Sequence, residues 1–206
     1  MAIEKSEALV LRVIPFRDTS KILTVYTAEH GLVSLLAKGV RAAKPRFGAA
    51  LELFAEIDLV YYHRDSRELQ LLSQATLLDP HLGLAAGTLR FAYGASVLEF
   101  LLKALTGHEP PGRLYPLSVK TLDFLARAPE AALPGVFRAF EIKAVSFLGH
   151  RPELFQCVEC GREIDGLAGV GFSALAGGAV CPSCAGGVPG VLPLSAAAGN
   201  LFRRLL

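Results

Sequence analysis

Several motifs that commonly carry enzyme chemistry are missing from this sequence of 206 residues. It has no tryptophan and one methionine, and it lacks the phosphate-binding loop of nucleotide hydrolases, the GxSxG turn of serine hydrolases and the HExxH helix of metalloproteases. No pair of carboxylates lies close together in an apolar stretch, as acid–base catalysis by such a pair requires. The five histidines fall in turns or at element ends, where we expect solvated side chains: His30, His63, His81, His108 and His150. We therefore expect that the chain is not an enzyme.

The sequence also lacks an apolar segment suited to secretion or to a membrane. Residues 1–7, MAIEKSE, contain no apolar core of a signal peptide. Residues 166–202 carry no charge, but Gly, Pro and Ser interrupt them too often for a membrane-spanning helix. The net charge is only +2, so affinity for a polyanion would require local clustering of cations. We expect a cytoplasmic protein with no membrane partner and with reduced thiols.

Cysteine is scarce, and all four residues fall in one segment, as Cys157-Val-Glu-Cys160 and Cys181-Pro-Ser-Cys184. Two such pairs of thiolates can complete the tetrahedral shell that structural Zn²⁺ prefers. Gly161 follows the first pair, where a turn needs a residue that tolerates unusual φ. Between the pairs, Val170–Ala174 and Ala176–Val180 are predicted to form two short strands around a glycine turn. The segment at about residues 155–188 is therefore predicted to form a zinc ribbon that holds one structural Zn²⁺.

Three other interpretations of the cysteines are disfavoured. Two disulfides would suit a secreted protein, and no signal peptide precedes this segment. A redox CxxC motif normally follows a strand of a thioredoxin-like unit, and neither pair does so. A catalytic zinc needs an open coordination position, which four thiolates do not leave.

The first part of the chain is rich in β-branched residues and in alternating apolar positions. Five strands are predicted, at Ala8–Ile14, Lys21–Thr27, Leu32–Ala37, Leu51–Tyr62 and Glu68–Leu78. Five strands without helical segments between them favour a small closed barrel such as an OB-fold. A small sandwich is the alternative.

After Asp79-Pro80 the spacing of apolar residues changes from 2 to 3.6. Helices are predicted at Leu89–Ala104, Leu117–Leu125 and Pro134–Leu148, and a short last helix is predicted after Ser195. Gly149 is expected to end the third helix, and the last helix is expected to turn Leu201, Phe202 and Leu205 inward. The predicted fold class is α+β, with an OB-fold domain at residues 1–80 and an α-helical domain at residues 81–206 that contains the inserted zinc ribbon.

The interval between Glu29 and Glu52 contains no acidic residue but gathers four cations, Lys38, Arg41, Lys44 and Arg46. Glycines in this interval would let the backbone approach phosphates, and the cations would supply affinity that is independent of sequence. Phe47 could add a face on which a base stacks. An ordinary solvated basic loop is the alternative interpretation, and an OB barrel favours nucleic-acid binding over it.

Two further groups of cations are candidate contacts. Phosphate contacts of second rank are predicted at the first loop, at Arg12, Arg17 and Lys21. On or just after the third predicted helix, next to phenylalanines, lie Arg138, Lys143 and Arg151. A basic rim around an apolar groove suits an acidic, hydrophobic peptide tail, although a solvated helix face explains this second group at least as well.

Several runs of the sequence form a specific combination when they are taken together. They are residues 8–12 and 15–41 (ALVLR and PFRDTSKILTVYTAEHGLVSLLAKGVR), Lys44-Pro-Arg46, Tyr61-Tyr62, Glu68–Leu72, and Phe147–Leu154 leading into Cys157–Gly161. This combination spans nearly the whole chain and resembles the bacterial recombination mediator family RecO. The C-terminus looks shorter than is usual for that family.

The resemblance implies an OB-fold, an α-helical domain with a zinc module in it, and no enzymatic turnover. It further implies binding of single- and double-stranded DNA, annealing of complementary strands, and a location at the bacterial nucleoid. The implied protein partners are RecR, with which members help load RecA, and the acidic C-terminal tail of single-stranded DNA-binding protein. A zinc-ribbon adaptor that acts mainly through protein contacts is the alternative function.

Overall fold

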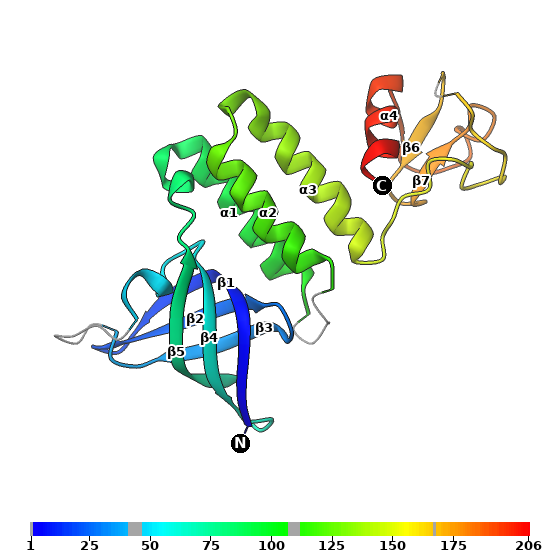
Figure 1. Cartoon of the computed structure of the whole chain (residues 1–206). Coiled ribbons are helices and arrows are strands. Elements are labelled where there is room, and N and C mark those ends of the chain that lie inside the picture. The colour runs from blue at the N-terminus through cyan, green and yellow to red at the C-terminus, as the bar shows by residue number, and fades with distance from the viewer. Residues whose placement is uncertain (1, 41–46, 107–111, 167) are drawn as a thin grey trace. The chain divides into compact units, whose positions relative to one another are not determined.

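The computed structural model describes residues 2–40, 47–106, 112–166 and 168–206 (Figure 1). Contacts within the chain divide it into two compact units, Met1–Phe137 and Arg138–Leu206. The expected division at residue 80 into separately folding domains stays a prediction. No helix in the described ranges is long and apolar enough to cross a membrane.

Five strands close into a barrel in the order β1-β2-β3-β5-β4 (Figure 1). They are β1 (Ala2–Phe16), β2 (Ser20–Thr27), β3 (Gly31–Ala37), β4 (Glu56–His63) and β5 (Leu69–Asp79). Strands β3 and β5 run parallel, with Ser34 opposite Leu69, and the other pairs are antiparallel. This order confirms the predicted OB-fold.

Strand β1 is the longest of the five barrel strands, and different parts of it pair with its two neighbours. Its first part, Ala2–Leu9, pairs with β4, and Ala8–Phe16 pairs with β2. The register shifts between Val10 and Arg12, and a bulge of this kind bends a strand enough to serve two neighbours. The strand begins at Ala2, six residues before the predicted Ala8. The sequence did not reveal these residues, because apolar and polar residues alternate only weakly among them.

The predicted strand from Leu51 is wrong over its first residues. Residues Gly48–Leu51 form a short 3₁₀ helix, η1, and Phe54 has a φ of 70°, so β4 begins only at Glu56. Phe47, which we expected to offer a stacking face, is 6% exposed and belongs to the barrel core. Its ring is therefore not available to a base.

The rest of the first unit is helical and packs on the barrel. It comprises η2 (Leu82–Ala86), α1 (Thr88–Ala104), α2 (Leu114–Arg127), η3 (Glu130–Ala132) and the start of α3 (Leu133–Phe147). Edge-to-face ring pairs join barrel to helices, with centroids 5.3 Å apart for Phe54–Phe91 and 5.6 Å apart for Tyr26–Tyr115. The predicted helices are confirmed. The expectation of a solvated His81 is wrong, because the residue as a whole is 3% exposed.

Helix α3 ends as its sequence predicts. Gly149 has a φ of 90°, and its N–H donates to the Ser146 carbonyl at 3.2 Å. The His150 N–H donates to the Val145 carbonyl at 2.9 Å. These two bonds satisfy carbonyls of the last turn in the way that a glycine C-cap allows.

The second unit contains a small sheet in the order β7-β6-β8. Its strands are β6 (Gly171–Ser173), β7 (Gly178–Val180) and β8 (Val191–Pro193), and α4 (Ala196–Leu205) follows. The Ser195 hydroxyl accepts from the Ala198 N–H at 3.2 Å, which confirms the predicted N-cap. Phe202 and Leu206 pack on the core of this sheet, whereas Leu201 is 50% exposed and does not face inward as expected.

Candidate functional site

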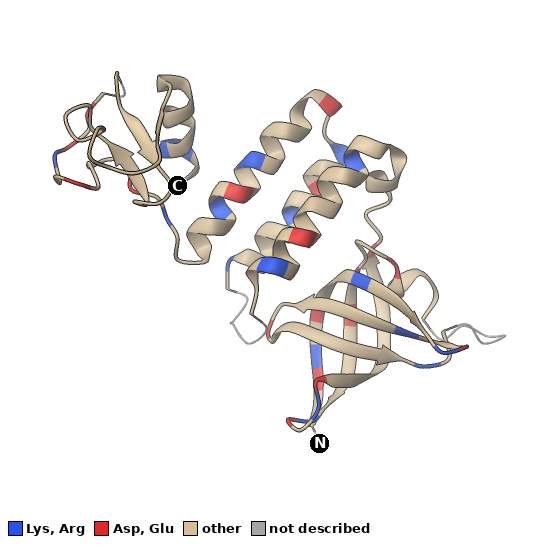
Figure 2. Ribbon diagram, turned by 180° about the vertical axis from the view of Figure 1, so that it is seen from behind, with Lys and Arg blue, Asp and Glu red and all other residues tan. Residues whose placement is uncertain are grey.

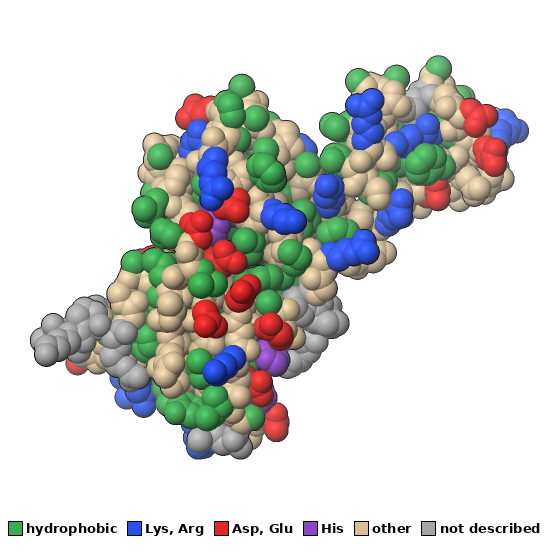
Figure 3. Space-filling view, viewed as in Figure 1, with side chains coloured by type: hydrophobic (Ala, Val, Ile, Leu, Met, Phe, Trp, Pro, Cys, Tyr) green, Lys and Arg blue, Asp and Glu red, His purple; other side chains and the backbone are tan. Residues whose placement is uncertain are grey.

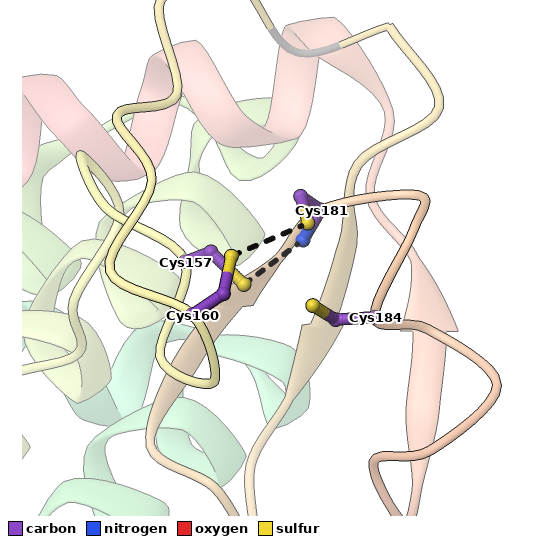
Figure 4. Close-up of side chains that lie close together, drawn as sticks. All are labelled: Cys157, Cys160, Cys181 and Cys184. Carbon is purple, nitrogen blue, oxygen red and sulfur yellow. Dashed lines mark hydrogen bonds between the residues drawn. The ribbon is translucent and has the colours of Figure 1, made fainter.

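The four cysteines meet beside strand β7 (Figure 4). Cys157 and Cys160 lie in a turn that precedes the sheet, and Cys181 and Cys184 lie in the turn after β7. Their sulfurs lie within 4.8 Å of one another, and the Cys160 and Cys181 sulfurs are 3.8 Å apart. All four are free thiols, and the first and third are buried.

Backbone hydrogen bonds fix both cysteine turns. The Gly161 N–H donates to the Cys157 carbonyl at 2.9 Å, with Gly161 at a φ of 71°. The Cys184 N–H donates to the Cys181 carbonyl at 3.0 Å, so each turn closes across its own pair. The Cys181 N–H points across to the Cys157 sulfur at 3.4 Å. The predicted need for glycine at position 161 is confirmed, since a positive φ is strained for other residues.

The thiols hold their protons unequally. The backbone N–H of Cys181 lowers the pKa of Cys157, and the Ser183 hydroxyl lowers the pKa of Cys181 to about 6. A hydrogen bond with Cys181 raises the pKa of Cys184 to about 12. These opposite directions arise because neighbouring sulfurs share protons. A cation among them would displace the remaining protons, so its binding would depend on pH.

This arrangement can hold a metal ion. Ligands at about 2.3 Å around a tetrahedral centre lie about 3.8 Å from one another, which is the measured Cys160–Cys181 separation. Four sulfurs select soft or borderline ions and fill a tetrahedral shell, which leaves no position for water or substrate. A metal in this site would therefore be structural.

One arginine that the sequence reasoning did not single out ties α4 to the cysteine module. The Arg203 guanidinium donates to the Leu154 carbonyl at 2.7 Å and to the Ile164 carbonyl at 2.5 Å. It also stacks over the Phe155 ring, 4.9 Å from the centroid. A basic residue near the end of a short helix is usually solvated, so the sequence carried no sign of this role.

Three of the predicted DNA contacts come together at one end of the barrel, as the strand register and the adjoining turn indicate. Figure 2 shows in blue where lysines and arginines lie along the ribbon. Arg17 occupies the β1–β2 turn, and Lys21 lies opposite Ala37 in the β2–β3 register, next to Lys38. The Val40 N–H donates to the Thr19 carbonyl at 2.8 Å, which joins the turn to the segment after β3. Arg17 and Lys38 are exposed, and Lys21 pairs with the exposed Glu52 at 2.9 Å. The other predicted contacts of this group, Arg41, Lys44 and Arg46, lie outside the described residues.

Arg12 lies apart from this end of the barrel. It lines a hollow between β1 and α1, together with Glu99 and Lys103. Its charge contributes to lowering the pKa of Glu99, after the hydrogen bond and charge of Lys103. The structure therefore groups Arg12 with helix α1 and not with Arg17 and Lys21.

A groove in the second unit joins two of the three cations predicted to bind a peptide tail. It has a volume of about 610 Å³ and an apolar lining that comes from α3, β6 and α4, namely Ile142, Val145, Phe172, Leu201 and Phe202. Arg138 and Arg151 stand at its rim, together with His150 and Glu141. Lys143 follows Ile142 by one residue and so projects from another face of α3, about 100° away.

The sequence reasoning missed the apolar residues of the groove. They belong to three elements that are distant along the chain, and each one looks like an ordinary core residue of its own element. Leu201 was expected to face inward, and it instead lines the groove with half of its surface exposed. These residues come together only in the folded protein.

Comparisons with known proteins agree along the whole chain. Two family models match, "Recombination protein O N terminal" over residues 1–81 and "Recombination protein O C terminal" over residues 88–206. A DNA repair protein RecO from Anaeromyxobacter sp. (strain K) is 35% identical over 192 residues, which are 93% of this chain and 74% of that protein. RecO from Symbiobacterium thermophilum is 35% identical over 210 residues, with 100% of this chain and 81% of that protein covered. RecO from Bacillus pumilus is 31% identical over 199 residues, with 97% and 75% covered. The chain therefore belongs to the RecO family of DNA repair and recombination proteins.

Proposed function

We propose that this protein is a DNA-binding recombination mediator without enzymatic turnover. It binds single- and double-stranded DNA, anneals complementary strands and, with RecR, helps load RecA onto strands coated by single-stranded DNA-binding protein. The observation that carries the proposal is the end of the OB barrel at which Arg17, Lys21 and Lys38 converge. A role in recombination places the protein at the nucleoid, in the bacterial cytoplasm.

The distribution of charge on the barrel supports this choice of surface. Acidic side chains gather on the barrel face shown in Figure 3. Glu7 and Asp58 lie directly opposite each other on β1 and β4, and Glu56 precedes Asp58 by two residues on the same strand. This acidic face repels phosphates, so DNA would approach the barrel at the Arg17 end. The predicted contacts Arg41, Lys44 and Arg46 follow Lys38 in sequence and would extend the same basic surface.

The same charges account for annealing. Two single strands repel each other through their phosphates, and cations on the protein replace condensed counterions around both. Contacts to phosphates carry no base identity, so the sequence of the strands would be read only by their own pairing. Annealing therefore needs no catalytic residue from the protein.

The metal in the cysteine module is proposed to be one structural Zn²⁺, held by Cys157, Cys160, Cys181 and Cys184. The tetrahedral spacing of the sulfurs supports this assignment. The ion would join the turn before the sheet to the turn after β7, and so would hold the wall of the groove in place.

The groove of the second unit is the proposed site for the acidic tail of single-stranded DNA-binding protein. An acidic, apolar peptide needs cations at the rim and hydrocarbon on the floor, and Arg138, Arg151, Ile142 and Phe202 supply them. Changing Arg151 to Ala should weaken binding of a labelled tail peptide, whereas changing the exposed Arg162, which lies on the ribbon away from the groove, should not. If both changes weakened peptide binding equally, the tail would not bind in this groove.

The alternative function, an adaptor that acts only through protein contacts, is tested by strand annealing. The full chain should accelerate pairing of two complementary labelled oligonucleotides at moderate salt and lose this effect at high salt. A full chain that binds the tail peptide but neither binds nor anneals DNA at any salt concentration would favour the adaptor.

A further inference from the structure

A second group of metal-ligating side chains lies where the barrel meets the helices of the first unit. Asp79 ends β5, His81 follows in the connection to η2, and Asp123 lies on α2. One ligand atom from each of the three lies within 4.8 Å of the other two. Gly83 allows η2 to approach α2 closely, because a Cβ atom at this position would come within 2.4 Å of the Ala126 carbonyl oxygen.

The histidine of this group is buried and only half satisfied. Its side chain is 1% exposed, and Nδ1 lies 2.9 Å from the Phe54 carbonyl oxygen. A carbonyl can only accept, so Nδ1 carries a proton. When the ring is neutral, its lone pair therefore lies at Nε2. Within the described residues, Nε2 has no hydrogen-bond partner, and its nearest charged atom is Asp123 Oδ1 at 3.7 Å.

A lone pair at Nε2 that faces the Asp123 carboxylate at 3.7 Å is unfavourable unless a proton or a cation lies between the two atoms. A buried polar atom without a partner costs about 1–3 kcal/mol, so a native structure rarely keeps one. A ring N–H that donates to a backbone carbonyl is also the usual outer partner of a metal-bound histidine, because it fixes the tautomer that leaves the other nitrogen free.

We propose that Asp79, His81 and Asp123 bind a divalent transition-metal ion such as Zn²⁺ or Mn²⁺. The imidazole suits Zn²⁺, and the two carboxylates suit both Zn²⁺ and Mn²⁺, whereas Mg²⁺ and Ca²⁺ prefer oxygen alone. Ligands at about 2.0–2.2 Å need to be closer together than the three atoms are. Asp123 can close this gap by rotating, since its side chain is 35% exposed.

Arg127 is the group that competes for this position. Its Nη2 lies 3.0 Å from Asp123 Oδ1 and 3.7 Å from Asp79 Oδ2. The arginine side chain is 72% exposed, so it can move into solvent while the ion takes both carboxylates. Asp79 stays in place, because its Oδ1 accepts from the backbone N–H of His81 at 2.7 Å.

The ion would pin the last strand of the barrel to α2. It would partly neutralise the negative charge at this junction, where Glu56 also lies. This site is separate from the cysteine cluster in composition and in position along the chain, and its role would be to fix the barrel on its helices.

Manganese tests the proposal without interference from the ribbon, because Mn²⁺ favours oxygen and nitrogen over thiolate ligands. Full-length protein with its ribbon metal retained would be titrated with Mn²⁺ and followed by electron paramagnetic resonance. We expect one bound ion, broadening of the amide signals of residues near His81 and Asp123 in nuclear magnetic resonance spectra, and a higher melting temperature with the ion.

Two variants and one control complete the test. Asn at position 81 keeps a donor for the Phe54 carbonyl and tolerates the left-handed backbone of His81, φ 46°, while it removes Nε2. His81→Asn and Asp123→Asn should each weaken Mn²⁺ binding at least tenfold, and Asp58→Asn, which changes an exposed carboxylate on β4, should leave it unchanged. The proposal would be overturned if the wild-type protein bound no Mn²⁺, or if both variants bound Mn²⁺ as tightly as the wild type does.

Discussion

At the scale of single residues, Glu56 has the most unusual environment among the carboxylates of the barrel. Burial is the largest cause that raises its pKa, and the negative charges of Glu7, Asp123 and Asp79 add to it. A positive charge on the nearby His81 lowers the pKa of Glu56, but by less than burial and the three carboxylates raise it. In the folded protein Glu56 is therefore easier to protonate than in the unfolded chain.

Because the pKa of Glu56 is higher in the folded than in the unfolded state, the stability of the protein should depend on pH. A carboxyl with a raised folded pKa favours the folded state while it is protonated, and this advantage is lost as pH rises from about 4.5 through the folded pKa. Glutamine resembles the protonated form. In protein without a divalent ion at Asp79, His81 and Asp123, Glu56→Gln should therefore raise the melting temperature at pH 7 and lose this gain toward pH 4. Glu68→Gln, at an exposed position before β5, is the control. A destabilised Glu56→Gln protein at pH 7 would show that the charge is needed.

At the scale of elements, the contact between η2 and α2 depends on a single glycine. Gly83 faces the Ala126 carbonyl, and Arg90 Nη1 donates to the neighbouring Leu125 carbonyl at 2.8 Å. Any side chain at position 83 would push the connection away from α2. This contact sets the position of His81 relative to Asp123.

Changing Gly83 to Ala should therefore destabilise the protein by about 1–3 kcal/mol, as overpacking does. Gly87→Ala is the matched control, because its nearest neighbour to a new Cβ would be Glu130 Oε1 at 3.8 Å. Urea unfolding followed by circular dichroism measures both. Equal stability of the two variants would mean that the connection shifts without cost.

Loss of the ribbon metal should affect the two units differently. Structural zinc in small modules contributes on the order of 10–16 kcal/mol of apparent binding energy. Cys157→Ser should therefore unfold the sheet of β6, β7 and β8 and release α4, whose Arg203 depends on the Leu154 carbonyl. Hydrogen exchange should rise across residues 150–206 and stay low in β1–β5, which have their own core. Simultaneous loss of protection in the barrel would contradict two separate cores.

The sequence predicted those elements in which apolar residues recur at a regular spacing. It did not predict the bounds of elements in which this spacing is interrupted. Alternation placed β2 and β3 within one residue of their observed ends. It misplaced the start of β4, because Phe54 takes a left-handed backbone that nothing in its side chain suggests. Strand β8 was not predicted, since a three-residue strand that ends in proline has no period to detect.

At the scale of the whole molecule, the cysteine site could be predicted and the other sites only in part. Four cysteines at a fixed spacing specify their own geometry, whatever the rest of the fold does. The groove and the Asp79–His81–Asp123 group depend on tertiary contacts among separate elements, so their residues looked like core or solvated positions. The cations of the barrel end lay in one sequence interval, but only the strand register shows that Arg17 joins Lys38.

The central claim is that DNA binds at the Arg17 end of the barrel, and the salt dependence of binding tests it most directly. Each phosphate contact on single-stranded DNA contributes roughly 0.7 to the slope of log affinity against log salt, so Arg17→Ala with Lys38→Ala should flatten that slope by about 1.4. Arg64→Ala with Arg67→Ala removes the same charge at the β4–β5 turn, which lies beside the opposite end of β1, and should leave the slope unchanged. An unchanged slope in the first double variant, or an equal loss in the second, would contradict this account.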